Sequence, residues 1–322
     1  MFKPSAFFAA MLLSSASIAG PASPAKPLLS LVESANDPAT LQGNAAVLRA
    51  QILLDRARFG PGEIDGQAGS NLRRAVRGYQ ATHGLAVSGA MNAETWTALN
   101  ADAGPALVSY TLTAADVAGS YAKVPEGMEA QQQLKSLGFE SVQEALGERF
   151  HASPALLKKL NPEADFGKAG TVLQVPNVAD LPALPKAAKL VIDKSDSTLA
   201  LLDADGKVLA QYPASSGSTH DPLPIGEWKI QSVTTDPSFH YNPALFWDAD
   251  PSHSKATIAP GPNNPVGRVW IDLSKPHYGI HGTPSPAAIG KTQSHGCVRL
   301  SNWDALAVAG AVGASVPVVM QE

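Results

Sequence analysis

The chain has 322 residues, too many for one ordinary hydrophobic core, so two or three domains are expected. Its formal net charge is −4 and only 16% of its residues are charged, with no basic stripe to neutralise phosphates, which excludes nucleic acid as a partner. A single cysteine excludes an internal disulfide, while 27 glycines and 26 prolines predict many turns and loops.

The N-terminal end has the plan of a cleavable signal peptide over residues 1–22. Lys3 is followed by an apolar run from Ala6 to Leu13 and then by small residues. The alternative is a membrane anchor, but the run is shorter than the roughly 20 residues that span a bilayer. We therefore expect export to the periplasm or cell envelope. Residues 23–43, rich in Pro, Ser and Ala, are expected to form a linker.

Residues 44–100 predict a small module of three helices. Apolar residues repeat at helical spacing on both sides of the glycine-containing loop F-G-P-G-E-I-D-G, and Asn92 is a plausible N-cap for the last helix. The segment resembles the peptidoglycan-binding domain type 1 in I-D-G at 64–66, A-V-R-G-Y-Q at 75–80 and T-W-T-A-L at 95–99. The resemblance implies binding to the cell wall. The alternative is a helical spacer whose aromatic residues only form its core.

Residues 105–178 predict an α+β segment. The runs L-G-E-R-F-H-A-S-P-A-L-L-K-K-L-N-P at 146–162 and G-T-V-L-Q-V-P at 170–176 resemble the second half of a LysM domain. The stretch 109–116 is a candidate for its first strand. About 30 residues separate the two parts, so the resemblance implies a LysM-like segment interrupted by an insertion. Whether it binds glycan stays open.

Residues 188–320 predict a mostly β domain. Short apolar runs at 189–193, 198–203 and 207–213 are typical of strands, and Asp205-Gly206 indicates a hairpin between the second and the third. One helix is expected at 303–311, near the C-terminal end.

The only cysteine of the chain, Cys297, lies in S-H-G-C-V-R at 294–299, and His281 lies in Y-G-I-H-G-T at 278–283. A neighbouring histidine can lower a thiol pKa, hold an ion pair with the thiolate, and move the proton to a leaving amine. No carboxylate follows His281 closely, so a backbone carbonyl is expected to orient its ring. The amides of Gly296 and Cys297 can stabilise an oxyanion, and Arg299 can bind a substrate carboxylate.

These residues resemble the catalytic domain of the L,D-transpeptidases, the YkuD family. Its motif of a histidine in an H-G-T-like run, followed by S/T-H-G-C and an Arg or Asn, is filled by His281, Ser294, His295, Gly296, Cys297 and Arg299. The resemblance implies a β-sandwich-like fold and orientation of the catalytic histidine by the carbonyl of Gly282. It also implies that Ser294 and Arg299 belong to the substrate-binding side of the site.

The activity implied by the resemblance is acyl transfer without a cofactor. Cys297 would be acylated by a peptidoglycan stem tetrapeptide with release of D-Ala, and the acyl group would pass to an amine. That amine would be a diaminopimelate side amine, a lysine of an anchored outer-membrane protein, or a free D-amino acid. The alternatives are an L,D-carboxypeptidase or hydrolase using water, and a non-catalytic peptidoglycan-binding protein.

Other interpretations stay open for single residues. His281, His295 and Cys297 are chemically permissible zinc ligands, although no fourth ligand is evident. His295 either helps to form the oxyanion site or packs under the loop, and Arg299 either binds substrate or pairs with a surface carboxylate. The aromatic run at 239–248 is either a lid over the site or a loop packed on the domain.

Overall fold

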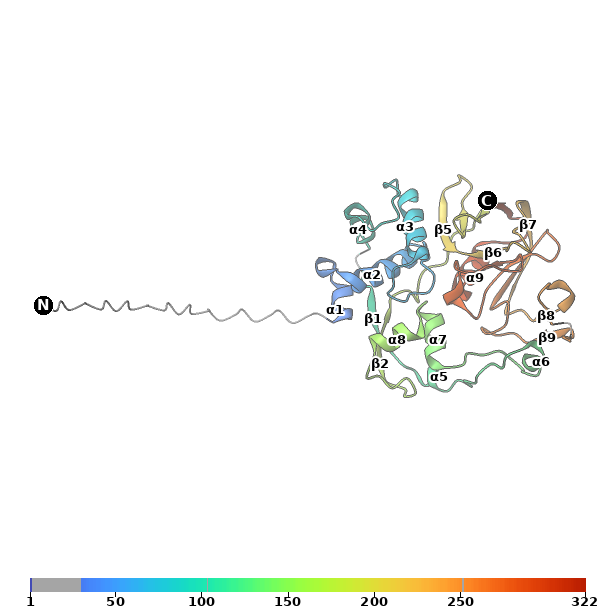
Figure 1. Cartoon of the computed structure of the whole chain (residues 1–322), viewed down its shortest axis with the longest axis horizontal. Helices are drawn as coiled ribbons and strands as arrows, with labels where there is room; N and C mark the ends of the chain where they lie inside the picture. Colours follow the sequence, from blue (N-terminus) through green and yellow to red (C-terminus); the bar gives the residue numbers. More distant parts are fainter. Residues whose placement is uncertain (2–29, 103, 251) are drawn as a thin grey trace.

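The computed structural model describes residue 1 and residues 30–322, except residues 103 and 251. The predicted signal peptide therefore lies, but for Met1, outside the described residues. From residue 30 onward, the helical module, the middle segment and the β domain pack side by side (Figure 1). Within the described part of the chain, no helix is long and apolar enough to cross a membrane.

The second half of the predicted linker is folded, which corrects the expectation for residues 23–43. Helix α1 (Leu31–Asn36) begins at a capping box formed by Ser30 and Glu33, and a short 3₁₀ helix, η1 (Pro38–Thr40), follows. Ala35 is fully buried, and the Asn36 amide side chain exchanges two hydrogen bonds with the backbone of Leu107. A good N-cap and one well-placed apolar face outweigh a composition that is typical of linkers.

Three helices form the N-terminal module in the expected order. They are α2 (Gly43–Arg56), α3 (Ser70–Thr82) and α4 (Ala93–Leu99). The side chain of Asn92 caps α4 by accepting a hydrogen bond from the Thr95 amide. One face of α2 packs with α3 and α4, while its other face packs against the middle segment, so the two segments share a continuous core.

The middle segment is a two-stranded antiparallel sheet with helices inserted between the strands. Its elements are β1 (Leu107–Thr111), α5 (Ala114–Val117), α6 (Met128–Gln131), α7 (Val142–Arg149), α8 (Pro154–Leu160) and β2 (Val172–Pro176). Helices α7 and α8 contribute Leu146, Leu156 and Leu157 to the core next to α2. The LysM resemblance of this segment stays a prediction.

The C-terminal domain is built on one nine-stranded mixed sheet. The strands in spatial order are β5 (Val208–Pro213), β4 (Thr198–Leu202), β3 (Lys189–Asp193), β13 (Pro317–Gln321), β7 (Gly226–Thr235), β10 (Val269–Leu273), β11 (Gly279–His281), β12 (Val298–Arg299) and β6 (Ser215–Ser216).

The two edge strands of this sheet, β5 and β6, are separated in the chain only by Ala214, so the sheet curls into a nearly closed barrel. The predicted β-sandwich-like architecture is corrected accordingly: one curled sheet takes the place of two stacked sheets. Helix α9 (Asn302–Ala311) packs against this sheet with Ala305, Val308 and Ala311 buried in the main core.

Two smaller elements complete the domain. Strands β8 (Phe239–Tyr241) and β9 (Ala256–Ile258) form a separate two-stranded hairpin, whose connection contains the 3₁₀ helix η2 (Pro243–Leu245). A further 3₁₀ helix, η3 (Pro286–Ala288), lies between β11 and β12. In Figure 1 the hairpin lies next to α6 of the middle segment.

Candidate active site

Cys297 and His281 are brought together by a parallel pair of short strands. In β11 and β12, Ile280 is paired with Val298 and His281 with Arg299, and Cys297 stands directly before β12. The Leu300 amide donates to the carbonyl of His281 at 2.9 Å, which extends the pairing. The half-buried thiol donates weakly to the His277 carbonyl at 3.7 Å. The fold therefore places the candidate nucleophile and base on neighbouring strands.

The ring of His281 is buried and held on both sides. Its Nδ1 lies 2.7 Å from the carbonyl oxygen of Gly282, so Nδ1 carries the proton and donates it to that carbonyl. The ring stacks on Trp270, with centroids 5.6 Å apart and planes 23° apart. This tautomer leaves Nε2 without a proton, as a general base requires. The contact with Gly282 is the one that the family resemblance implies.

Burial favours the neutral form of both groups in the resting site, whereas a thiolate–imidazolium ion pair was expected. Burial raises the pKa of the Cys297 thiol, although the Gly279 backbone amide and the Arg299 guanidinium oppose that effect. Burial also lowers the pKa of His281 to about 4. Since neither charge is well solvated, the proton stays on sulfur until a substrate arrives.

Gly296 has a backbone conformation that its neighbours require. Its φ is +99°, and a Cβ at this position would lie 2.8 Å from the ring of Tyr278. A side chain would therefore clash with that ring and strain the backbone. The turn therefore requires glycine directly before the nucleophile.

Arg299 is half-buried and electrostatically coupled to the thiol. Its guanidinium favours the Cys297 thiolate and disfavours a charged His281, which places the positive charge near both groups. One Nη donates to the backbone carbonyl of Gln293, while Nε is buried and has no partner among the described residues. Among the described residues, Arg299 forms no ion pair with a carboxylate, and its Nε has no hydrogen-bond partner.

Ser294, predicted to lie on the substrate-binding side of the site, forms its hydrogen bonds within the protein. Its side chain is buried, donates to the carbonyl oxygen of Cys297 at 2.5 Å, and accepts from the Gly217 amide at 2.8 Å. Both functions of the hydroxyl are therefore used within the protein. Ser294 ties the turn of the nucleophile to the loop after β6.

Comparison with known proteins places the domain in a family. A family model described as "L,D-transpeptidase catalytic domain" matches residues 187–320, and one described as "Putative peptidoglycan binding domain" matches residues 43–99. The chain is 31% identical over 164 residues to the protein named "Putative L,D-transpeptidase YkuD" of Bacillus subtilis, covering 51% of this chain and 83% of the relative. The chain belongs to the L,D-transpeptidase family. This is a family of cysteine transferases.

Two other similarities of this L,D-transpeptidase are more limited. It is 29% identical over 154 residues to the Escherichia coli protein named "Probable L,D-transpeptidase YbiS", which covers 46% of this chain and 49% of that relative. A solved L,D-transpeptidase from Mycobacterium smegmatis is 21% identical, with coverage of 50% of this chain and 77% of that one. The TM-score of 0.35 is too low to establish a shared overall fold.

His295 lies at the rim of the site and faces the aromatic loop, which we define as residues 242–250. Its Nε2 lies 2.9 Å from a carboxylate oxygen of Asp248, and the side chain is 39% exposed. Phe246 packs edge-on against the same ring, with centroids 5.3 Å apart. Within the aromatic run at 239–248, Tyr241 belongs to a small core with Phe246 packed against it. Phe246, Trp247 and Asp248 contact His295 at the rim of the site.

Asn302 is a site residue of this L,D-transpeptidase that the sequence did not reveal. Fully buried, it accepts from the amides of Arg268 and Thr283, both at 3.1 Å, and so joins the residue after Gly282 to the start of β10. Its amide donates to Glu148 of α7 at 2.5 Å. Burial raises the pKa of Glu148 to about 7. The middle segment therefore contacts the support of the catalytic histidine directly.

The zinc interpretation finds no support in the arrangement of side chains. Among the described residues, no group of three or more His, Cys, Asp and Glu side chains is placed to hold a metal ion. His281 donates to a backbone carbonyl and His295 pairs with a carboxylate, so the two rings serve different purposes.

Proposed function

We propose that this protein is an exported L,D-transpeptidase that transfers the acyl group of a peptidoglycan stem tetrapeptide through a thioester on Cys297. The observation that carries the proposal is the ring of His281, fixed through Nδ1 by the Gly282 carbonyl on the strand paired with β12, which directly follows Cys297. A neutral imidazole with a free Nε2 is the form that can take a thiol proton. Membership of the family supports the reaction class.

In the acylation step, Cys297 attacks the carbonyl carbon of the third residue of the tetrapeptide, which is joined by an amide bond to the terminal D-Ala. The S–C bond forms as the C–N bond breaks, and the thiol proton moves to His281 Nε2 and then to the leaving amine of D-Ala. The amides of residues 296 and 297 are the proposed donors to the developing oxyanion, at about 3 kcal/mol per donor. Because both groups begin neutral, the charge separation occurs only with substrate in the site.

Arg299 is the proposed partner of a substrate carboxylate. Its buried Nε has an unused donor, and an Arg–carboxylate pair in a partly desolvated site is strong and directional. The guanidinium also stabilises the thiolate as it forms, since it already lowers the thiol pKa in the resting site. We assign positioning rather than substrate binding to Ser294 and His295.

In the second step an amine attacks the thioester carbonyl and gives a proton to His281 Nε2. The new C–N bond forms as the S–C bond breaks, and His281 passes that proton to the departing thiolate. We propose an amine acceptor, either a diaminopimelate side amine, a protein lysine or a D-amino acid. Water in the same position would give an L,D-carboxypeptidase.

Wall binding is proposed for the helical module. A cleft of about 450 Å³ lies beside α3 and is lined by Leu72, Arg73, Val76, Gly89 and Met91 among others. Asn71 and Arg74 of α3 donate to the carbonyls of Ile289 and Gly290, in the loop that leads to the nucleophile. A polymer held in this cleft would remain in a fixed relation to the catalytic domain, in the cell envelope.

The test is product analysis by mass spectrometry with a purified disaccharide-tetrapeptide and a D-amino acid. Release of D-Ala with a cross-linked dimer or an exchanged tetrapeptide supports amine transfer. Tripeptide as the only product would assign a carboxypeptidase. Turnover that survives in Cys297→Ala would overturn the proposal.

A further inference from the structure

We propose that the insertion in the middle segment positions the aromatic loop beside Cys297, with Leu137 as the positioning residue. We call this insertion the strap and define it as residues 118–140. The kinetic test of this inference depends on the proposed function, whereas the structural test by hydrogen exchange does not. It gives a catalytic purpose to a segment that otherwise only interrupts a LysM-like sequence.

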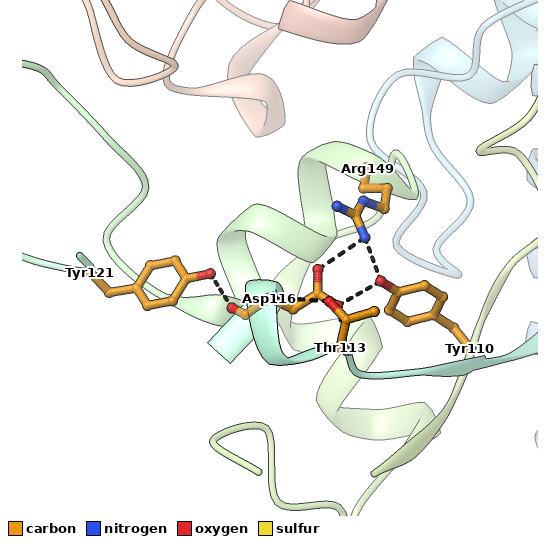
Figure 2. A network of polar contacts seen from close by, with 5 residues as sticks. All are labelled: Tyr110, Thr113, Asp116, Tyr121 and Arg149. Atoms are coloured by element: carbon orange, nitrogen blue, oxygen red, sulfur yellow. Dashed lines mark hydrogen bonds and ion pairs between the residues drawn. The ribbon is translucent and has the colours of Figure 1, made fainter. Parts of the chain in front are cut away.

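The strap starts from a rigid point on the middle segment (Figure 2). The carboxylate of Asp116 accepts hydrogen bonds from Thr113 and from the hydroxyl of Tyr110, and it pairs with Arg149 of α7 at 3.0 Å. Tyr121, already on the strap, donates its hydroxyl to the Asp116 carbonyl. The first residues of the strap are therefore tied to α5, to β1 and to α7.

At its far end the strap enters the β8–β9 hairpin. Leu137 is 0% exposed and forms a small core with Tyr241, Ala256 and Ile258. Its amide donates to the Pro260 carbonyl at 2.9 Å, and its carbonyl accepts from the Asn263 amide at 3.0 Å.

The strap and the hairpin approach each other so closely that a glycine is needed between them. Gly261 has a φ of +146°, and an added Cβ would lie 2.1 Å from the carbonyl oxygen of Leu137. A backbone contact this close is specific to one position of the strap. Helix α6, earlier on the strap, also lies against β9.

The hairpin needs such a partner because it is too small to be ordered alone. It has two strands of three residues, and it is not part of the nine-stranded sheet. An isolated two-stranded hairpin is marginal in water and is stabilised by packing against another element. Among the described residues, the strap supplies that packing through Val124, Met128, Leu134 and Leu137.

The aromatic loop connects the two strands of this hairpin, so the order of the hairpin reaches the site. Tyr241 packs on Phe246 with centroids 5.5 Å apart, and Phe246 packs on His295 at 5.3 Å. A carboxylate oxygen of Asp248 lies 2.9 Å from Nε2 of the same histidine, and this histidine stands two residues before the nucleophile in the chain. A continuous series of contacts thus runs from Leu137 to the turn of Cys297.

The first test compares Leu137→Ala with Leu157→Ala. Both leucines are 0% exposed in the middle segment, but Leu157 lies in the core next to α2 and is not part of the hairpin's core. Hydrogen exchange is measured for the amides of β8 and β9, and kcat and KM for tetrapeptide turnover. We expect Leu137→Ala to speed exchange in the hairpin at least about tenfold and to lower kcat/KM about tenfold, with Leu157→Ala within about twofold of wild type in both. Equal exchange in the two variants would overturn the proposal.

A second variant and a double-mutant cycle separate positioning from simple loss of stability. Gly261→Ala places a methyl group against the Leu137 backbone and so displaces the strap from the hairpin. This variant should reproduce the exchange pattern of Leu137→Ala. If the strap acts through the aromatic loop, the losses of kcat/KM in Leu137→Ala and Phe246→Ala will combine to less than their product. Fully multiplicative losses would contradict the inference. Absence of wild-type turnover would instead refute the proposed function, while the exchange measurement would still decide the role of the strap.

Discussion

At the scale of residues, the site is distinguished by a thiol and an imidazole that are both neutral at rest. The usual expectation for a Cys–His pair is an ion pair with a depressed thiol pKa. Here burial dominates both groups, and the proton of His281 Nδ1 is fixed on Gly282. The nucleophile is therefore protected from reagents until a substrate places its carbonyl near the sulfur.

The pH dependence of thiol alkylation tests this state. Iodoacetamide reacts with the thiolate, so we expect slow alkylation of Cys297 at pH 7 and a rise of roughly tenfold per pH unit toward the raised thiol pKa. The rate is measured by intact-mass spectrometry, with Cys297→Ala as the blank. A fast rate that stays constant from pH 5 to pH 8 would show a stored ion pair instead.

Ser294 provides a second test at this scale. Ser294→Ala removes a donor to the Cys297 carbonyl and an acceptor from the Gly217 amide, both buried. We expect a loss of about 1–3 kcal/mol in the free energy of unfolding and a lower kcat with little change in KM. Urea unfolding and steady-state kinetics measure these effects. A raised KM with unchanged stability would restore the substrate-binding role.

At the scale of elements, the turn at residue 296 decides where the nucleophile lies. Gly296→Ala places a methyl group against the Tyr278 ring in a left-handed backbone conformation. We expect kcat to fall about 100-fold in a protein that still folds, because a shift of about 1 Å is enough to lose the attack geometry. Activity assays with circular dichroism check both parts.

The matched control is Gly310→Ala in helix α9, where an added Cβ meets no atom within 4 Å. Alanine is the better helix former, so this variant should be as active as wild type and slightly more stable. Normal activity in Gly296→Ala would show that the turn does not control the nucleophile.

Elements with local signals could be predicted from the sequence, whereas their long-range partners could not. The N-cap of Asn92 and the motif around Cys297 follow from residues close together in the chain. By contrast, Asn302 meets Glu148 across 154 positions, and the curled sheet depends on β5 and β6 lying at opposite edges. Short polar residues such as Asn302 carry no periodic pattern that would reveal such contacts.

At the scale of the whole molecule, the three segments meet around a buried polar junction. A cavity of about 110 Å³ is lined by Asp55 and Arg58 of the helical module, His151 of the middle segment, and Tyr212 and Asp304 of the β domain, among others. His151 lies 3.0 Å from Asp55 and stacks on Trp303 at 5.1 Å. The segments are thus joined by polar contacts as well as by apolar packing.

This junction predicts a loss of stability as the pH rises from about 4 to about 7. Burial raises the pKa of Asp304 from 3.8 to about 7, so the folded protein binds a proton that the unfolded chain has released. The extra stability that comes from the bound proton is fully present below about pH 4 and is lost as the pH rises through 7. From pH 6 to pH 8 we expect this one group to lower the free energy of unfolding by roughly 1 kcal/mol.

Thermal unfolding at several pH values measures the effect, and Asp304→Asn is the control. The amide does not titrate, so this variant should show a weaker decline between pH 6 and pH 8. An unchanged decline would locate its cause elsewhere, for example in Glu148, whose pKa is also raised to about 7 by burial.

The central claim is that Cys297 carries the acyl group of a stem peptide. Intact-mass spectrometry of the protein mixed with tetrapeptide, in the absence of an acceptor amine, tests it most directly. We predict a mass increase equal to the mass of the tetrapeptide minus that of the released D-Ala, located on the peptide that contains Cys297 and absent from Cys297→Ala. Release of D-Ala without any adduct in wild type, or an adduct that persists in Cys297→Ala, would contradict this account.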